Sequence, residues 1–155
     1  TGFNDGAVDA RGRFGAGTLH EGHVNSLYRL DPDGSVREMD TGFGVPNGIS
    51  WSPDDRTMYF TDSAESTIFA YTFDLETGRI GDRRVWAESS TRPGVPDGLT
   101  VDAEGCVWSA RWGAGCVERY SPAGRLIETV TLAAAFPTSV TFGGADLGEL
   151  YITSA

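Results

Sequence analysis

Short apolar runs separated by turn-forming residues repeat along the whole chain. Within 45–63, the run Gly48–Trp51 ends at the turn Ser52-Pro53-Asp54-Asp55, and a second run follows at Met58–Thr61. Apolar runs of about four to eight residues bounded by Pro, Asp and Gly are typical of strands rather than helices. The pattern therefore predicts an all-β fold.

The same arrangement recurs four times. Positions 4, 47, 97 and 138 open the four copies and are separated by 43, 50 and 41 residues. A period of roughly 40–50 residues carried by strands indicates the blades of a β-propeller. Each period adds a third strand that ends at a turn, at 26–30, 67–73 and 116–120. Short final strands such as 36–39 and 126–132 follow, so we expect four strands per blade.

A propeller ring needs more blades than this chain supplies. Closed rings have typically about 4–8 blades, and 155 residues hold about three and a half. We therefore expect residues 1–155 to be a partial propeller, truncated at both ends, whose partners include the missing blades of the parent chain.

The composition excludes several classes of partner. The net charge is −10, with twelve Arg and no Lys, whereas phosphate binding needs a clustered basic surface, so a nucleic-acid partner is not expected. No apolar run approaches the roughly 20 residues of a membrane span, so no membrane partner is expected either.

Two cysteines lie on neighbouring predicted strands. The turn at 113–115 places Cys106 too far along its strand from Cys116 for a disulfide. Two free thiols fit a reducing compartment, and we expect a cytoplasmic protein.

The recurrent positions are the candidates for chemistry. In a propeller the start of each innermost strand faces the central channel, so Asn4, Asn47, Asp97 and the pair Thr138-Ser139 should converge there. An all-oxygen set with one carboxylate suits a hard cation such as Ca²⁺ or Mg²⁺, with Mn²⁺ or Zn²⁺ tolerated. The alternative is turn chemistry alone, because Asn-Gly and Asp-Gly are common turn dipeptides.

The four tryptophans have two interpretations. Large aromatic side chains fill the space between packed sheets, which is the role expected of Trp51, Trp86, Trp108 and Trp112. A sugar-stacking role for Trp108 or Trp112 is the alternative.

Short motifs in a fixed order carry a family resemblance. They are Phe3-Asn4-Asp5-Gly6, Gly17-Thr18, Leu27-Tyr28-Arg29, Pro46-Asn47-Gly48, Tyr59-Phe60-Thr61-Asp62-Ser63, Asp74-Leu75-Glu76-Thr77-Gly78, Pro96-Asp97-Gly98 and Phe142-Gly143-Gly144. Together they resemble the SMP-30/gluconolactonase/LRE-like family, which includes regucalcin and bacterial sugar lactonases. The resemblance implies a six-bladed β-propeller with one divalent cation in its channel, Ca²⁺ before Zn²⁺, Mn²⁺ or Mg²⁺.

The family's metal ligands are a Glu, an Asn and an Asp. By resemblance, Asn47 and Asp97 match the Asn and the Asp, while the Glu belongs to a segment before Thr1. We therefore expect this chain alone to bind the cation weakly and to lack activity until the remaining blades are supplied.

The resemblance also implies substrate contacts. The family's substrate-holding Asn matches Asn4, and Gly2 stands where members often carry an Arg that contacts the sugar. Glu21 matches an acidic position near the site entrance, and His20 beside it is a candidate substrate contact. His20 and His23 suit an exposed loop equally well.

These residue types favour a metal-dependent lactonase that opens a gluconolactone-like aldonolactone to the aldonic acid. Asp97 would hold the cation and take the proton of the attacking water. The sequence has no Gly-x-Ser-x-Gly motif and only two His, in one short loop, which argues against a Ser-His-Asp hydrolase. The alternatives are a calcium-binding, regucalcin-like regulatory propeller without turnover, an esterase or organophosphate-type hydrolase on the same site, and a repeat scaffold for protein partners.

Overall fold

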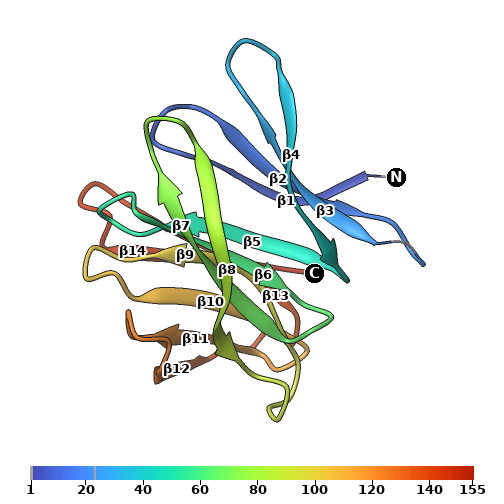
Figure 1. Cartoon of the computed structure of the whole chain (residues 1–155). Helices are drawn as coiled ribbons and strands as arrows, with labels where there is room; N and C mark the ends of the chain where they lie inside the picture. Colours follow the sequence, from blue (N-terminus) through green and yellow to red (C-terminus); the bar gives the residue numbers. More distant parts are fainter. Residues whose placement is uncertain (1, 23) are drawn as a thin grey trace.

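Strands are the regular elements of this protein. The computed structural model describes residues 2–22 and 24–155, and no helix occurs among these residues. The strands form three four-stranded antiparallel sheets and one two-stranded sheet, each a simple meander in chain order (Figure 1). The all-β prediction and the expected three and a half blades are both confirmed.

The strand bounds follow the repeat. The first sheet contains β1 (Gly2–Val8), β2 (Phe14–Leu19), β3 (Asn25–Leu30) and β4 (Val36–Phe43). The second contains β5 (Pro46–Trp51), β6 (Thr57–Asp62), β7 (Thr67–Asp74) and β8 (Arg79–Glu88). The third contains β9 (Val95–Val101), β10 (Val107–Trp112), β11 (Cys116–Tyr120) and β12 (Leu126–Thr131), and the fourth contains β13 (Pro137–Gly143) and β14 (Glu149–Ser154).

The first strands of successive sheets are neighbours in space. β1 contacts β5, β5 contacts β9, and β9 contacts β13. In Figure 1 the sheets fan outward from this row of strands. This is the arrangement of propeller blades around a central channel, and it places the recurrent sequence positions side by side.

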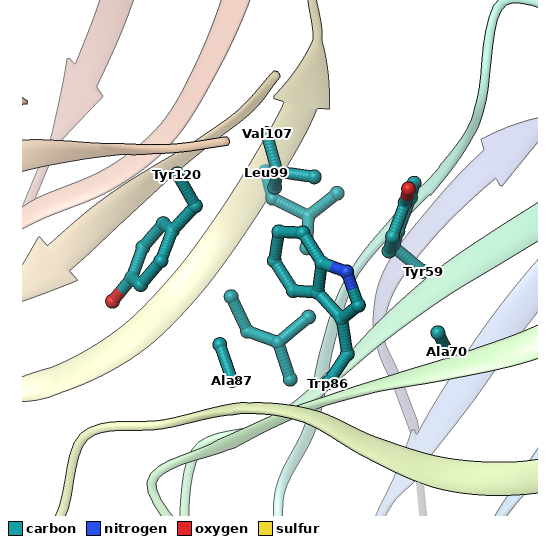
Figure 2. Packing of buried hydrophobic residues seen from close by; sticks show 8 residues of the cluster. Tyr59, Ala70, Trp86, Ala87, Leu99, Val107 and Tyr120 are labelled. Carbon is teal, nitrogen blue, oxygen red and sulfur yellow. The ribbon is translucent and has the colours of Figure 1, made fainter. Parts of the chain in front are cut away.

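The core lies between the sheets. Between the second and third sheets, the Trp86 ring packs against Tyr59 at a centroid distance of 4.8 Å and against Tyr120 at 5.8 Å (Figure 2). Trp51 packs on Phe73 of its own sheet at 5.8 Å and against a cluster that includes Leu27 and Phe43 of the first sheet. Trp108, of the third sheet, packs on Phe142, of the fourth, at 5.9 Å. The expected packing role is confirmed for these three tryptophans.

The cysteine prediction is also confirmed. Cys106 and Cys116 are both buried and free. Arg111 pairs with Cys116, and Val107 pairs with Tyr120, so Cys106 lies beyond the opposite end of the strand pair. The described part of the chain contains no helix long and apolar enough to cross a membrane.

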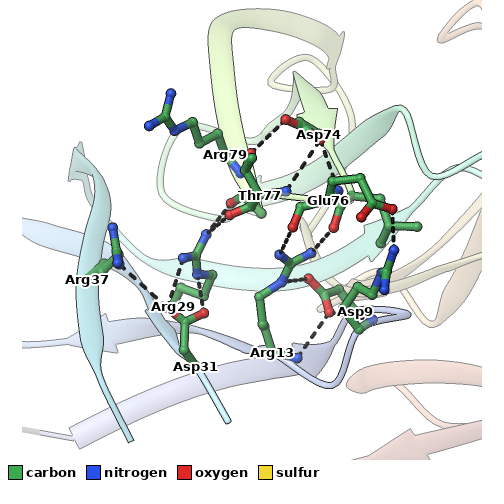
Figure 3. A network of polar contacts seen from close by, with 12 residues as sticks. Asp9, Arg13, Arg29, Asp31, Arg37, Asp74, Glu76, Thr77 and Arg79 are labelled. Atoms are coloured by element: carbon green, nitrogen blue, oxygen red, sulfur yellow. Dashed lines mark hydrogen bonds and ion pairs between the residues drawn. The ribbon is translucent and has the colours of Figure 1, made fainter. Parts of the chain in front are cut away.

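Two arginines of the first sheet clamp the turn between β7 and β8 (Figure 3). The Arg13 guanidinium donates to the Leu75 carbonyl at 2.5 Å and pairs with Asp9 at 2.6 Å, and the side chains of Arg13 and Asp9 are buried. Arg29 donates to the carbonyls of Thr77, at 3.2 Å, and of Gly78. The clamp ties the first sheet to the second through charge-assisted hydrogen bonds.

We predict that Arg13→Ala destabilises the protein by about 3–5 kcal/mol, because it leaves the Asp9 carboxylate buried without its counter-charge. Arg37→Ala is the control, since the Arg37 side chain is 66% exposed and lies 3.5 Å from Asp31; an exposed pair of this kind contributes about 0–1 kcal/mol. Urea unfolding of the full-length protein measures both. Equal costs for the two variants would contradict the clamp.

Glycine permits the close approach of the first strands. A Cβ on Gly48 would lie 2.5 Å from the Leu99 amide nitrogen and 2.8 Å from the Asp97 carbonyl oxygen. A Cβ on Gly98 would clash with Ser139 Oγ and would lie 2.6 Å from Ser139 Cβ. The backbones of β5, β9 and β13 can therefore adopt this spacing only with glycine after the key Asn and Asp.

We predict that Gly48→Ala costs about 1–3 kcal/mol or more, as for other overpacked sites, because the atoms it meets are backbone atoms that cannot move aside alone. Gly2→Ala is the matched control, since no atom lies within 4 Å of its added Cβ. Thermal unfolding of both variants provides the comparison, and an unchanged midpoint for Gly48→Ala would refute the packing argument.

Candidate functional site

The key residues occupy β-bulges in the first strand of each sheet. In three of these strands two consecutive residues oppose a single residue of the second strand; the pairs are Asn4-Asp5, Asn47-Gly48 and Asp97-Gly98. Thr138 is the extra residue at the corresponding place in β13. A bulge breaks the ladder and redirects the side chain, and bulges are frequent next to active sites.

The bulges decide between the two interpretations of Asn-Gly and Asp-Gly. Both dipeptides lie inside strands, β5 and β9, rather than in hairpin turns. Gly48 and Gly98 are not among the glycines with positive φ. The turn interpretation is therefore wrong, and the repeated dipeptides serve the close packing of strands and the aim of the preceding side chain.

A chain of hydrogen bonds fixes the amide of Asn47. Ser63 Oγ donates to the Pro96 carbonyl at 2.5 Å, and Asn47 Nδ2 donates to Ser63 Oγ at 2.8 Å. Asn4 Nδ2 donates to Asn47 Oδ1 at 3.0 Å and to the Pro46 carbonyl at 2.8 Å. Since Asn47 Nδ2 is committed to Ser63, Oδ1 of Asn47 is held on the side of Asn4.

Two adjoining hollows meet at this group. One is lined by Asn4, Asp5, Asn47, Asp97, Thr138 and Ser139, and we call it the polar floor. The other, which we call the second hollow, is lined by Asn4, Leu19, Val45, Asn47, Ser63, Ala64, Val95, Asp97 and Trp112. Asn4, Asn47 and Asp97 belong to both hollows, and Thr138 and Ser139 line the polar floor, so the structure brings together the residues expected to converge.

The polar floor carries uncompensated negative charge. Burial, together with the nearby Asp5 carboxylate, raises the pKa of Asp97 to about 6, although the Gly98 amide opposes the rise. Burial also raises the pKa of Asp5, against the lowering effect of the Gly6 amide, which donates to it at 2.7 Å. Neither carboxylate has an ion-pair partner within the described residues.

The donor set fits a cation. Asn47 Oδ1 and the Asp97 carboxylate are the hard oxygen ligands that Ca²⁺ and Mg²⁺ prefer. Two half-buried carboxylates that repel each other are stabilised by a positive charge between or beside them. Asn47 and Asp97 could therefore hold a divalent cation, with Asp5 adding to its electrostatic attraction.

His20 and Glu21 lie at the margin of the site. They follow Leu19, a residue of the second hollow, but neither lines that hollow or the polar floor. The Glu21 side chain is exposed, and the His20 amide donates to Asn25 Oδ1 at 2.8 Å. Their roles as substrate contacts stay predictions, and His23 lies outside the described residues.

The sequence interpretation missed two contributors. Asp5 directly follows Asn4 and shares its bulge, and Ser63 ends the motif Tyr59–Ser63, so both had a signal in their neighbours. Neither was assigned a role, because their interactions with Asp97 and Asn47 join segments far apart in the chain.

A second acidic group is structural. Asp102, Glu104 and Cys106 lie close enough together to hold a metal. However, Asp102 Oδ2 accepts from Arg119 at 2.7 Å and from Trp108 Nε1 at 2.9 Å, and Oδ1 accepts from the Cys106 amide at 2.9 Å. These hydrogen bonds already satisfy the Asp102 carboxylate, so its role is to stabilise the turn between β9 and β10.

The charge on Asp97 gives a pH prediction. On folding, the pKa of Asp97 rises from 3.8 to about 6. The protonated carboxyl therefore contributes stability that is fully present below pH 3.8 and is lost as the pH rises through 6. With a metal chelator present, the free energy of unfolding of Asp97→Asn should match that of wild type near pH 4. At pH 7.5 it should be higher by about 1 kcal/mol, a value reduced for solvent screening.

Asp54→Asn is the control, because hydrogen bonds from Ser52 and the Arg56 amide lower the pKa of Asp54. This substitution should therefore change the free energy of unfolding in the opposite direction. Thermal unfolding of the full-length protein from pH 4 to 7.5 makes the comparison. A pH-independent difference between Asp97→Asn and wild type would contradict the raised pKa.

The chain is similar to several known proteins. The chain is 42% identical to pentonolactonase XacC of Haloferax volcanii over 156 residues, which cover 100% of this chain and 54% of that protein. The calcium-binding protein regucalcin of Agrobacterium tumefaciens has a similar structure, with a TM-score of 0.94, 33% identity, and coverage of 99% of this chain and 53% of its own.

A gluconolactonase of Xanthomonas campestris is similar with a TM-score of 0.82 and 28% identity, over 99% of this chain and 54% of that one. The chain thus spans about half the length of the relatives that it matches. The family model of the SMP-30/gluconolactonase/LRE-like region matches residues 1–155 in full. The chain therefore belongs to the SMP-30/gluconolactonase/LRE-like family.

Proposed function

We propose that the protein containing this chain is a metal-dependent lactonase that hydrolyses an aldonolactone to the aldonic acid. The observation that carries the proposal is the convergence of Asn4, Asn47 and Asp97 from three bulges onto one negatively charged floor. Relatives named pentonolactonase and gluconolactonase support this class of substrate.

A divalent cation would be held by Asn47 and Asp97, with Ca²⁺ first and Zn²⁺, Mn²⁺ or Mg²⁺ as alternatives. When bound, such a cation supplies positive charge that polarises a carbonyl and lowers the pKa of water. The hydrogen bonds from Asn4 and to Ser63 orient the Asn47 amide so that its oxygen serves as the ligand.

Asp97 is the proposed proton acceptor. Without a cation, burial and Asp5 raise the pKa of Asp97 to about 6. A cation held beside the carboxylate would lower that pKa and keep Asp97 ionised at neutral pH, as a proton acceptor must be. Asp97 takes a proton from the attacking water as the new C–O bond forms at the carbonyl carbon. It returns the proton to the ring oxygen when the ring C–O bond breaks, so the product is the open hydroxy acid.

Asn4 is proposed to orient the substrate. Both hydrogens of Asn4 Nδ2 are used, by Pro46 and Asn47. Its Oδ1 therefore remains to accept a hydrogen bond from a substrate hydroxyl. Glu21 and His20, beside the second hollow, are proposed as further contacts at the entrance, while Gly2 offers no side chain where family members often carry an Arg.

A second candidate is calcium binding without turnover. The regucalcin of Agrobacterium tumefaciens, described as a calcium-binding protein, favours it. Esterase or organophosphate-type hydrolysis would use the same carboxylate and the same cation.

The buried free thiols support the proposal of a reducing, cytoplasmic compartment.

We predict that Asp97→Ala lowers kcat for lactone hydrolysis by about 10²–10⁴-fold, the usual contribution of a general base. Hydrolysis of a panel of sugar lactones by the full-length protein is followed by pH-stat, after chelation and re-addition of Ca²⁺, Mg²⁺, Mn²⁺ or Zn²⁺. Asp54→Ala, in the exposed turn between β5 and β6, is the control and should keep wild-type turnover. Cation binding that depends on Asp97, with no turnover of any lactone, would establish the calcium-binding candidate instead.

A further inference from the structure

Trp112 differs from the other tryptophans of the chain in its placement. It ends β10 at the rim of the second hollow, which it lines together with Asn47 and Asp97. Trp112 is 44% exposed, whereas Trp86 is buried between sheets. The exposed part of the indole is therefore available to a ligand that enters the second hollow.

The backbone at Trp112 is firmly held. The preceding residue, Arg111, is 1% exposed. Its guanidinium donates to the carbonyls of Ser89 at 2.9 Å, Pro93 at 2.8 Å and Gly94 at 3.2 Å, all in the loop that leads into β9. The rim residue and the strand that carries Asp97 are therefore locked to each other.

The indole itself is supported on one side. Its ring packs against Phe136, from the loop before β13, with a centroid distance of 5.1 Å and an interplanar angle of 43°. The support comes from a different sheet, so the ring position does not depend on the β10–β11 turn alone. An aromatic side chain preorganised in this way loses little conformational entropy when a ligand stacks on it.

The second hollow has both apolar and polar residues. Its apolar residues besides Trp112 are Leu19, Val45, Ala64 and Val95, and its polar residues are Asn4, Asn47, Ser63 and Asp97; of the polar ones, Asn4, Asn47 and Asp97 also line the polar floor. A ligand that fits both parts has a carbonyl and hydroxyls on one side and a face of C–H groups on the other. The ring of a lactone has this amphipathic form, and open-chain esters lack a fixed C–H face.

We propose that Trp112, supported by Phe136, stacks on the C–H face of the lactone ring and selects cyclic over open-chain esters. This inference rests on the proposed lactonase function. Trp112 contacts the ring through its indole face and takes no part in proton transfer, so its contribution is to binding and to specificity.

The test compares Trp112→Ala, Trp112→Leu and Trp112→Phe in the full-length, metal-loaded protein. For a sugar lactone, Trp112→Ala and Trp112→Leu should each raise KM about tenfold with kcat within about twofold, since stacking acts on binding. Trp112→Phe should recover most of the affinity. The methyl ester of the same acid should show the same KM in all four proteins.

Trp108→Phe is the matched control, because Trp108 packs on Phe142 and lies outside the second hollow. It should leave both KM values unchanged. Thermal unfolding and cation affinity are measured for every variant, because a merely structural role of Trp112 would lower these as well as the affinity for the lactone.

A binding measurement separates this inference from the lactonase proposal. An anhydroalditol, a cyclic polyol ether that cannot be hydrolysed, is titrated calorimetrically into wild type, Trp112→Leu and Trp112→Phe. If Trp112→Leu binds the anhydroalditol more weakly than both wild type and Trp112→Phe, the result supports stacking. It does so even if the protein hydrolyses no lactone, because absence of turnover would contradict only the proposed activity. Equal dissociation constants in all three proteins, or an unchanged KM in Trp112→Leu, would overturn the role of Trp112.

Discussion

The close contact between the backbones of β5 and β9 is the constraint on which the site depends. The Cα of Gly48 faces the Leu99 amide and the Asp97 carbonyl at a spacing that any Cβ would prevent. Gly98 allows the same approach of β9 to Ser139 in β13. Each glycine follows a key Asn or Asp. The close contact that the glycine permits therefore also fixes where the preceding side chain lies. The bulges then turn these side chains away from the ladder and toward one another.

Electrostatics at the floor follow from that packing. β1 and β9 both contact β5, and in this row Asp5 lies near enough to Asp97 for its charge, together with burial, to raise the pKa of Asp97. Folding therefore creates a group of like charges that raise the pKa of Asp97. The hydrogen bonds to Ser63 and from Asn4 fix the orientation of the Asn47 amide, because Nδ2 donates to Ser63 and Oδ1 accepts from Asn4.

The periphery of the chain is organised around arginine. Arg13 and Arg29 join the first two sheets by capping the carbonyls of one turn, and Arg111 holds the loop before β9. In each case a buried guanidinium serves several backbone acceptors at once, which its planar array of donors allows. These hydrogen bonds hold the turn between β7 and β8, and the loop before β9, against the strands that carry the arginines or adjoin them. The residues that line the two hollows come from several strands of all four sheets and from the loops beside them.

The sequence by itself determined the strands, their four-strand repeat and the identity of the recurrent residues, because strand alternation and turn chemistry are encoded within a few neighbouring positions. It also placed Asn4, Asn47 and Asp97 in one channel, since equivalent positions of repeated blades become neighbours. Only the tertiary structure decided that Asn-Gly and Asp-Gly lie in bulges, that Asp5 and Ser63 belong to the site, and that Trp112 lines the rim while Trp51, Trp86 and Trp108 pack between sheets. These features depend on the register and spacing of strands that are tens of residues apart, where a shift of one residue would turn a side chain to the opposite face.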